Sequence, residues 1–235
     1  MIDFQPYASS SSGNLYTVSD GKTMIMLDCG LPWKKARELL QFKTSHIAGI
    51  LLTHRHMDHC KGAKDAARAG IDIYASHPTF NSLQVPDHRA NVIEHDQQFQ
   101  IGTWTILPFE TIHDTEGALG FYMVNNECEA FLYLTDTAYS PVRFARLHVV
   151  AIECNNIEEI LSGNIVSGHM PTSLGHRVRR SHMSLERVIS MIKANDLSTC
   201  RQIWLLHLSD ANSNEELMRR KVQETVGVPV YVAQS

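Results

Sequence analysis

The sequence predicts an α/β protein in which two β-sheets pack face to face and helices cover their outer sides. Strand-like runs come in two batches along the chain, and helix-like segments separate them. Histidines and aspartates repeatedly follow strand-like runs directly, which gathers them along one edge of the sheets. With 235 residues, 43% of them apolar, the chain can bury the core of one large domain, and we predict that residues 1–235 form a single domain.

The composition favours a cytoplasmic protein. Its five cysteines are odd in number, scattered and never spaced as Cys-x-x-Cys, which indicates neither a disulfide framework nor a zinc ribbon. The first residues lack the pattern of a signal peptide, and no apolar run approaches the roughly 18 residues that span a bilayer, so no membrane partner is expected. A net charge of −4 provides no global basic field for a long polyanion, although a local groove can still be positive.

The N-terminal residues predict two short strands, 2–7 and 15–18, joined by a tight loop of small and polar residues over 8–14. Two interpretations of this loop remain open. Ser11 and Asn14 belong either to a hydroxyl- and amide-rich lip that contacts substrate or to an ordinary turn.

A third strand, 23–30, ends in an acid and a glycine, and a helix is predicted over 32–42. Asp28 lies at the end of this strand. We expect it to support a neighbouring metal-binding loop by hydrogen bonding rather than to ligate the metal; capping the helix is the alternative.

The densest polar cluster follows the apolar run 47–52. It reads Thr53-His54-Arg55-His56-Met57-Asp58-His59. Three imidazoles and a carboxylate would each need a buried partner in a core, whereas together they suit a borderline-soft divalent metal. In an extended or turning segment, His54 and His56 project to one side, while Asp58 and His59 can reach a second point about 3.5–4 Å away, as in a two-metal site. A solvated histidine-rich loop is the alternative.

Three later strand-like runs also end in a ligand-type residue. These are His113 after 99–108, Asp136 after 130–134, and His207 after 202–206. Asp136 can offer one carboxylate oxygen to each of two metals and is the candidate bridge; a turn-capping aspartate is the alternative. A lone histidine is more often structural, so His113 and His207 gain weight from the upstream motif.

The remaining elements follow from the same periodicities. We predict helices over 61–69, 185–195 and 214–226, strands over 71–75, 120–124, 149–156 and 228–232, a short helical stretch after residue 156, and an irregular segment over 76–98.

A local basic patch lies within residues 168–182. It contains His169, His176, Arg177, Arg179, Arg180 and His182. Recognition of phosphate, with Arg180 and His182 contacting substrate, explains the patch, and a solvated charged face explains it almost as well. His182 lies near the start of the predicted helix 185–195, where the helix dipole favours anions.

These residues resemble a known family. The run from Thr53 to His59 resembles the HxHxDH signature of the metallo-β-lactamase superfamily, and His113, Asp136 and His207 match its later ligand positions in order. The segments 9–14, 152–155, 181–184 and 207–209 resemble the YycJ-like branch, a relative of the RNase Z phosphodiesterases. That branch is also similar to phage enzymes that degrade cyclic nucleotides to defeat the Pycsar defence system.

The resemblance implies an αββα metallo-β-lactamase sandwich, with two mixed sheets flanked by helices, and two divalent metals. By position, one metal would be held by His54, His56 and His113, the other by Asp58, His59 and His207, with Asp136 bridging. Histidine-rich ligation favours zinc over manganese. His182 falls where RNase Z-like enzymes keep a histidine that contacts phosphate or protonates the leaving group.

Two positions depart from the family pattern. Ser181 replaces the usual glycine before that histidine, and the Asn-His-Asp that often follows the glutamate is reduced to Asn155-Asn156.

We therefore predict a dinuclear-metal phosphodiesterase in which Asp58 orients or deprotonates the attacking water and His182 acts as an imidazolium. Among substrates, 3′,5′-cyclic nucleotides are favoured, because the chain is short and acidic and lacks an evident arm to grip a polymer. The resemblance adds a phage anti-defence role in the host cytoplasm and a homodimer. The alternatives are a YycJ-like DNA or RNA exonuclease and, from another class, a non-catalytic metal-binding sensor or interaction protein.

Overall fold

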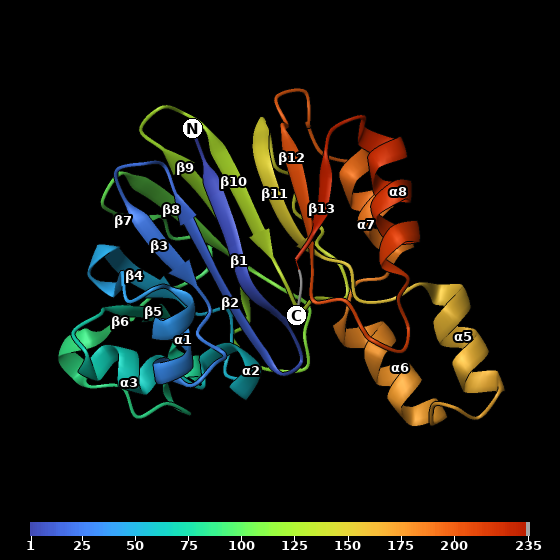
Figure 1. The fold of residues 1–235 in the computed structure, drawn as a ribbon, viewed down its shortest axis with the longest axis horizontal. Helices are drawn as coiled ribbons and strands as arrows, with labels where there is room; N and C mark the ends of the chain where they lie inside the picture. The colour runs from blue at the N-terminus through green and yellow to red at the C-terminus, as the bar shows by residue number, and fades with distance from the viewer. Residues whose placement is uncertain (234–235) are drawn as a thin grey trace. The chain divides into compact units, whose positions relative to one another are not determined.

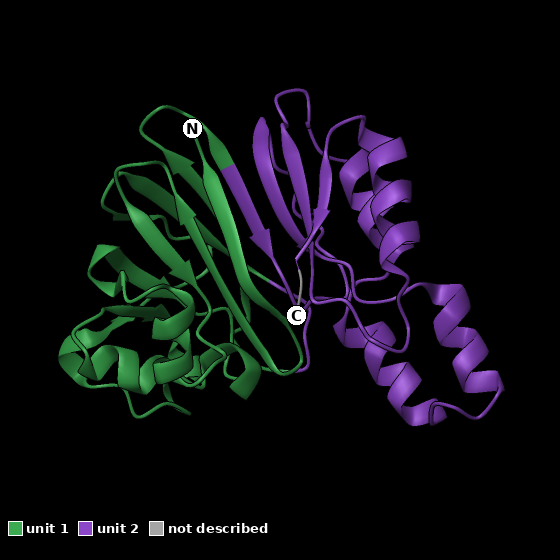
Figure 2. Cartoon of the chain, in the orientation of Figure 1, with its two compact units in different colours: residues 1–110, 115–130, 234–235 green, residues 111–114, 131–233 purple. Residues whose placement is uncertain are grey.

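The computed structural model describes residues 1–233 and contains two mixed β-sheets flanked by helices (Figure 1). Within these residues, six strands form one sheet in the order β1-β2-β3-β4-β5-β6, and seven form the other in the order β13-β12-β11-β10-β9-β8-β7. Each sheet has antiparallel and parallel neighbours, which confirms the predicted fold class. The chain divides into two compact units, residues 1–110 with 115–130, and residues 111–114 with 131–233 (Figure 2). A single domain therefore stays a prediction.

The first unit contains the six-stranded sheet. Its strands are β1 (Asp3–Ser10), β2 (Gly13–Ser19), β3 (Met24–Leu27), β4 (Ile47–Leu51), β5 (Ile73–Ala75) and β6 (Ala90–Val92). The strands β3 to β6 run parallel, and β4 is an almost continuous apolar run, as a parallel strand buried on both faces requires. The buried end of β4 fixes where the polar motif after Leu52 begins.

Four short helices of the first unit lie after these strands. They are α1 (Trp33–Leu39), α2 (Met57–Cys60), α3 (Ala63–Arg68) and α4 (His77–Phe80). The helices α1 and α3 contact each other and contribute Trp33, Ala36 and Ala66 to a buried cluster that also contains Met26 and Ile50. This packing holds the ends of β3 and β4, from which the candidate ligands project.

The predicted loop over residues 8–14 is wrong, because β1 and β2 extend into it and leave only Ser11 and Ser12 as a turn. Polar side chains in this hairpin find partners within it: the Ser9 and Tyr16 hydroxyls lie 2.7 Å apart. Small hydroxyl residues are therefore compatible with a strand here, although their composition suggests a loop.

The predicted helix 61–69 is confirmed by α3, and a further short helix, α2, lies before it inside the polar motif. One further prediction in the first unit needs correction. Residues 76–98 are not wholly irregular, since they contain α4 and the edge strand β6, which pairs parallel with β5.

The seven-stranded sheet has an antiparallel and a parallel part. In the first unit, β7 (Phe99–Ile101), β8 (Trp104–Glu110) and β9 (Leu119–Asn125) pair antiparallel. The other strands are β10 (Ala130–Leu134), β11 (Leu147–Glu153), β12 (Gln202–Leu206) and β13 (Val230–Val232). The strands β11, β12 and β13 run parallel, so Glu153 at the end of β11 and His207 directly after β12 lie at the same edge of the sheet.

The helices of the second unit are α5 (Glu158–Val166), α6 (Thr172–Ser181), α7 (Leu185–Lys193) and α8 (Glu215–Val226). The helices α7 and α8 contact each other, α8 contacts β13, and α5 and α6 contact each other (Figure 1). Ser184 and Asn214 accept backbone N–H bonds at the starts of α7 and α8, which confirms these two predicted helices. Within residues 1–233, no helix combines the length and apolar character needed to cross a membrane.

The helix α6 was not predicted, because its central glycine and its few apolar residues give a weak helical pattern. Gly175 is buried, and a Cβ atom built there would lie 2.2 Å from Ile165 Cδ1 on α5. A glycine that lowers helix propensity thus allows close packing of the two helices. The basic patch is carried by a helix, and His182 follows its last residue.

Candidate metal centre

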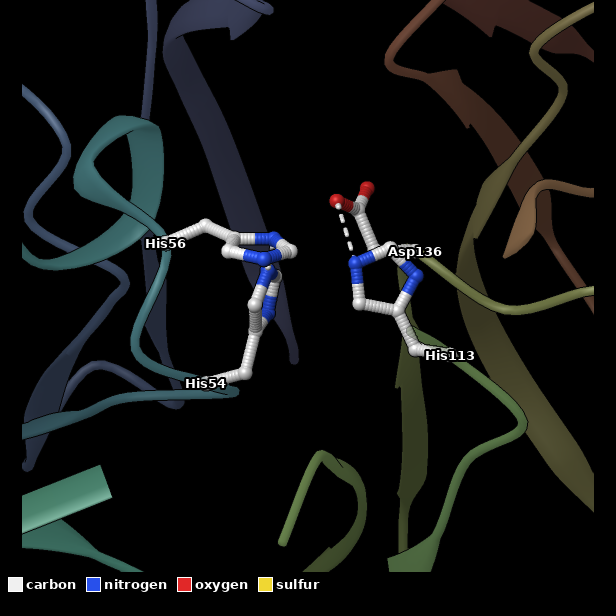
Figure 3. Close-up of side chains that lie close together, drawn as sticks. All are labelled: His54, His56, His113 and Asp136. Atoms are coloured by element: carbon white, nitrogen blue, oxygen red, sulfur yellow. Dashed lines mark hydrogen bonds and ion pairs between the residues drawn. The ribbon is translucent and has the colours of Figure 1, made fainter. Parts of the chain in front are cut away.

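His54 and His56 emerge from the end of β4 and face each other in the first unit (Figure 3). The Thr53 hydroxyl lies 3.0 Å from His54 Nδ1, and His54 Nε2 lies 3.0 Å from His56 Nδ1. Ligand atoms about 2.0–2.1 Å from a tetrahedral zinc are about 3.3 Å apart, so this separation suits two nitrogens on one ion. These two residues fit a metal.

Asp58 and His59 on α2 form a second pair of candidate metal ligands. His59 Nε2 lies 3.5 Å from an Asp58 carboxylate oxygen, while His59 Nδ1 lies 2.8 Å from Asp28 Oδ2. Asp28 also accepts a 2.8 Å bond from the backbone N–H of Thr53. A carboxylate on one ring nitrogen leaves the other available to a metal, so the predicted supporting role of Asp28 is confirmed. No side chain caps α1, which excludes Asp28 as its cap.

Asn14, predicted to contact substrate, is buried beside the metal motif. Its amide nitrogen lies 3.0 Å from His59 Nε2 and donates to the carbonyls of Ser10 and Asp58, while its amide oxygen accepts from the Tyr16 hydroxyl. These contacts make Asn14 a positioning partner of the motif. Ser11 lies exposed in the hairpin turn, and its contact with substrate stays a prediction.

Gly30 brings the backbone after β3 against the metal motif. Its N–H donates to the Asn14 carbonyl at 2.9 Å, and a Cβ atom built on it would lie 1.7 Å from the Asp58 carbonyl oxygen. A side chain at position 30 fits only if the backbone of α2, which carries Asp58 and His59, moves.

Replacing Gly30 by alanine should therefore destabilise the protein by about 3 kcal/mol, the upper part of the range for overpacking, because the clash is with backbone. Urea unfolding measures this change in the free energy of unfolding. Gly163→Ala is the control: Gly163 lies in α5 with nothing within 4 Å, and this variant should gain up to about 1 kcal/mol. Equal stabilities of the two variants would show that the approach of Gly30 to Asp58 is unimportant.

The second unit brings together His113, Asp136 and His207. His113 Nδ1 donates to the Ser181 carbonyl at 2.9 Å, and His113 Nε2 lies 3.7 Å from Asp136 Oδ2 (Figure 3). The other Asp136 oxygen lies 3.1 Å from His207 Nδ1. Each oxygen of one buried carboxylate thus faces a different imidazole, which is an arrangement suited to a bridging ligand.

Asp136 and His207 both have left-handed backbone conformations, with φ of 45° and 53°. His207 directly follows β12, and Asp136 is separated from the end of β10 by Thr135. Such conformations are costly for residues other than glycine, and they turn each side chain toward the cluster. Two of the candidate ligands therefore carry local backbone strain.

A buried acid, Glu153, holds His182 beside this cluster. His182 Nδ1 lies 2.6 Å from Glu153 Oε1, and the other Glu153 oxygen accepts the backbone N–H groups of Thr137 and Met183. Burial alone would raise the pKa of Glu153, but the charge of His182 and hydrogen bonds from His182 and His207 hold that pKa below its ordinary value. Burial would lower the pKa of His182, and the Glu153 carboxylate outweighs it and raises that pKa. Both shifts favour a carboxylate on Glu153 and an imidazolium on His182.

This acid–histidine pair borders the metal ligands. Four residues each offer one atom that could ligate a metal, and these four atoms lie within 4.8 Å of one another: Asp136, Glu153, His182 and His207. Glu153 already accepts four hydrogen bonds, so we interpret it as the partner of His182 and not as a ligand. Sequence reasoning missed this role, although Glu153 ends a buried strand as the other site residues do.

Residue Asp114 is a second functional residue that sequence reasoning missed. Its carboxylate lies 3.2 Å from His113 Nε2 and accepts a 2.8 Å bond from Arg177 Nε on α6. His113 is thus tied to α6 through Asp114 as well as through the Ser181 carbonyl. Arg180, predicted to contact substrate, lies exposed on the same helix, and that contact stays a prediction.

The chain is similar to a known protein family, to two sequence relatives and to a solved structure. Residues 23–207 match the model of the family described as "Beta-lactamase superfamily domain". Exodeoxyribonuclease WalJ of Streptococcus pneumoniae is 31% identical over 227 residues, covering 89% of this chain and 82% of the relative. Exodeoxyribonuclease YycJ of Bacillus anthracis is 27% identical over 243 residues, covering 96% and 89%. The metallo-beta-lactamase fold protein YhfI from Bacillus subtilis has a similar fold, with a TM-score of 0.75 at 16% identity over 100% of this chain and 97% of that one.

Proposed function

Because the chain belongs to the β-lactamase superfamily, we propose that it is a metal-dependent phosphodiesterase that removes nucleotides from DNA. The observation that carries this proposal is the Glu153–His182 pair next to Asp136 and His207. A histidine hydrogen-bonded to a buried carboxylate beside candidate metal ligands suits a reaction in which an alkoxide departs from a phosphate ester. The two exodeoxyribonuclease relatives, which match most of the chain, favour DNA as the ester.

We propose that the predicted ligands bind two divalent metals. The set comprises His54, His56, Asp58, His59, His113, Asp136 and His207. Bound divalent metals supply Lewis-acid polarisation of the phosphate and lower the pKa of water. Five imidazoles among seven ligands favour zinc over manganese.

In the proposed mechanism, the protein residues orient the reactants and move protons. Asp58 orients water toward phosphorus and accepts a proton as the new P–O bond forms. His182 donates the proton on Nε2 to the leaving oxygen as the old P–O bond breaks, because its Nδ1 is engaged by Glu153. Glu153 raises the pKa of His182 and so favours the imidazolium form that donates this proton.

A second candidate substrate is a 3′,5′-cyclic nucleotide, with a phage anti-defence role. The net charge of −4 supports it, because an acidic chain attracts a long polyanion weakly. A homodimer that acts in the cytoplasm belongs to the same proposal, and sedimentation analysis of the purified protein tests the dimer.

A substrate panel with metal-analysed protein tests this function. We expect hydrolysis of 5′-labelled DNA strands with release of mononucleotides, slower or no hydrolysis of cyclic mononucleotides, and loss of activity on removal of metal by EDTA with recovery on addition of zinc. Faster turnover of a cyclic nucleotide would favour the second candidate. About two metals per chain without turnover of any phosphodiester would favour a non-catalytic metal-binding protein.

A further inference from the structure

A cavity of about 250 Å³ in the second unit opens on the segment that follows Asp136. It is lined by Tyr139, Ser140, Arg143, Arg187, Ser190 and Met191. Pockets for drug-sized ligands measure about 300–1,000 Å³, so this cavity suits a smaller group. None of the candidate ligands or the Glu153–His182 pair lines it, which makes it distinct from the site described above.

The segment 136–139 connects the cavity to the candidate catalytic residues. Thr137 donates its backbone N–H to Glu153, and its hydroxyl donates to the Tyr139 carbonyl at 2.8 Å. Arg187 donates from Nη1 to the carbonyls of Ala138 and Arg179, at 3.0 and 2.8 Å. A ligand in the cavity therefore contacts the segment that carries Asp136 and touches the arginine that holds the end of α6.

The side chains of the cavity match the parts of a nucleotide. Two guanidinium groups favour an anion, three hydroxyl groups offer hydrogen bonds, and the lining contains no carboxylate. Arg143 has no hydrogen-bond or ion-pair partner within residues 1–233, so its charge is available to a phosphate. The ring of Tyr139, 49% exposed, offers a face on which a base can stack.

We propose that this cavity binds one nucleotide of a DNA single strand, with the base on Tyr139 and a phosphate on Arg143, while a neighbouring phosphate of the same strand is cleaved. The inference rests on the proposed function and deepens it, because it makes the substrate a polymer. A cyclic mononucleotide has one phosphate and cannot occupy the cavity and the catalytic site together. A duplex is disfavoured, since its paired bases are not free to stack on a side chain.

The test measures binding without turnover. Full-length protein is stripped of metal with EDTA, and the Kd of a fluorescein-labelled pentathymidylate is measured by fluorescence anisotropy. Tyr139→Ala should weaken binding about fivefold to 150-fold, the range for loss of one base–aromatic stack, whereas Tyr139→Phe, which keeps the ring, should bind as the wild type does. Arg143→Glu should weaken binding and lower the salt dependence of log Kd by about 0.7, the value for one phosphate contact.

Arg219→Glu is the matched control, because it makes the same charge change on the exposed helix α8 and should leave Kd unchanged. Thermal unfolding checks that each variant is folded. Wild-type affinity in both Tyr139→Ala and Arg143→Glu would overturn the inference. If the substrate panel shows no hydrolysis of any phosphodiester, the proposed function fails, yet the binding comparison still decides whether the cavity holds a nucleotide.

Discussion

Replacing Asp136 by alanine should remove both metal and activity. The carboxylate is buried, and its two oxygens face His113 and His207. A single water molecule that replaced the carboxylate could not contact both imidazoles in the same way. Loss of a bridging ligand removes several kcal/mol of transition-state stabilisation, which corresponds to a fall in turnover of at least about 1,000-fold. Metal analysis by mass spectrometry and the rate on a labelled oligonucleotide measure the two losses.

The matched control for this experiment is Asp210→Ala. Asp210 is exposed in the loop after β12, so its removal changes the net charge by the same amount without touching the site. This control should keep its metal and its rate. An Asp136→Ala protein with wild-type metal content and turnover would remove Asp136 from the bridge.

Replacing His182 by alanine should lower kcat by about 100-fold to 10,000-fold while the metal content stays unchanged, because His182 is proposed as the proton donor and not as a ligand. His176→Ala is the control, since His176 is exposed on α6. Steady-state kinetics and metal analysis of the same samples give both quantities. Wild-type turnover in His182→Ala would reject this role.

The pH dependence follows from the raised pKa of His182. Burial opposes the shift, but the charge and hydrogen bond of Glu153 raise this pKa above the ordinary value of about 6.5. A group whose pKa is raised on folding contributes stability that is fully present below its unfolded pKa and is lost as pH rises through its folded pKa. Activity that needs the imidazolium should fall over the same alkaline range.

Glu153→Gln tests whether this carboxylate sets the alkaline limb of the pH profile. Glutamine keeps the size of the side chain and removes its charge, so the pKa of His182 should fall and the alkaline limb of kcat should move to lower pH. A merely structural contribution of Glu153 would lower the rate without moving that limb. If the alkaline limb of kcat stays at the same pH in this variant, Glu153 does not control the protonation of His182.

Much of this site could be predicted from the sequence, because its ligands follow strand ends. A buried apolar run that stops at a histidine or aspartate marks one edge of a sheet, and this signal identified His54, Asp136 and His207. The hydrogen bonding of Asp28 was also predictable, because Asp28 directly follows β3, the neighbour of β4, and its partner His59 belongs to the polar motif after β4.

Other features depend on contacts between distant residues. Glu153 and His182 are 29 positions apart, so no local pattern marks them as a pair. Asn14 carries the amide of a typical turn residue, yet it is buried because Tyr16 and His59 provide its partners. The cavity at Tyr139 requires α7 to lie against the segment after β10, and single-sequence patterns do not encode that approach.

The hydrogen bond from His113 to the main chain of Ser181 has a consequence for variation at position 181. A peptide oxygen accepts the imidazole proton whatever side chain its residue carries, so serine in place of the glycine that the family resemblance leads one to expect leaves this restraint intact. The Ser181 hydroxyl donates a hydrogen bond to the carbonyl of Arg177, so it does not compete for the bond between His113 and the Ser181 carbonyl. Because a backbone carbonyl orients His113, the buried position 181 can carry different small amino acids.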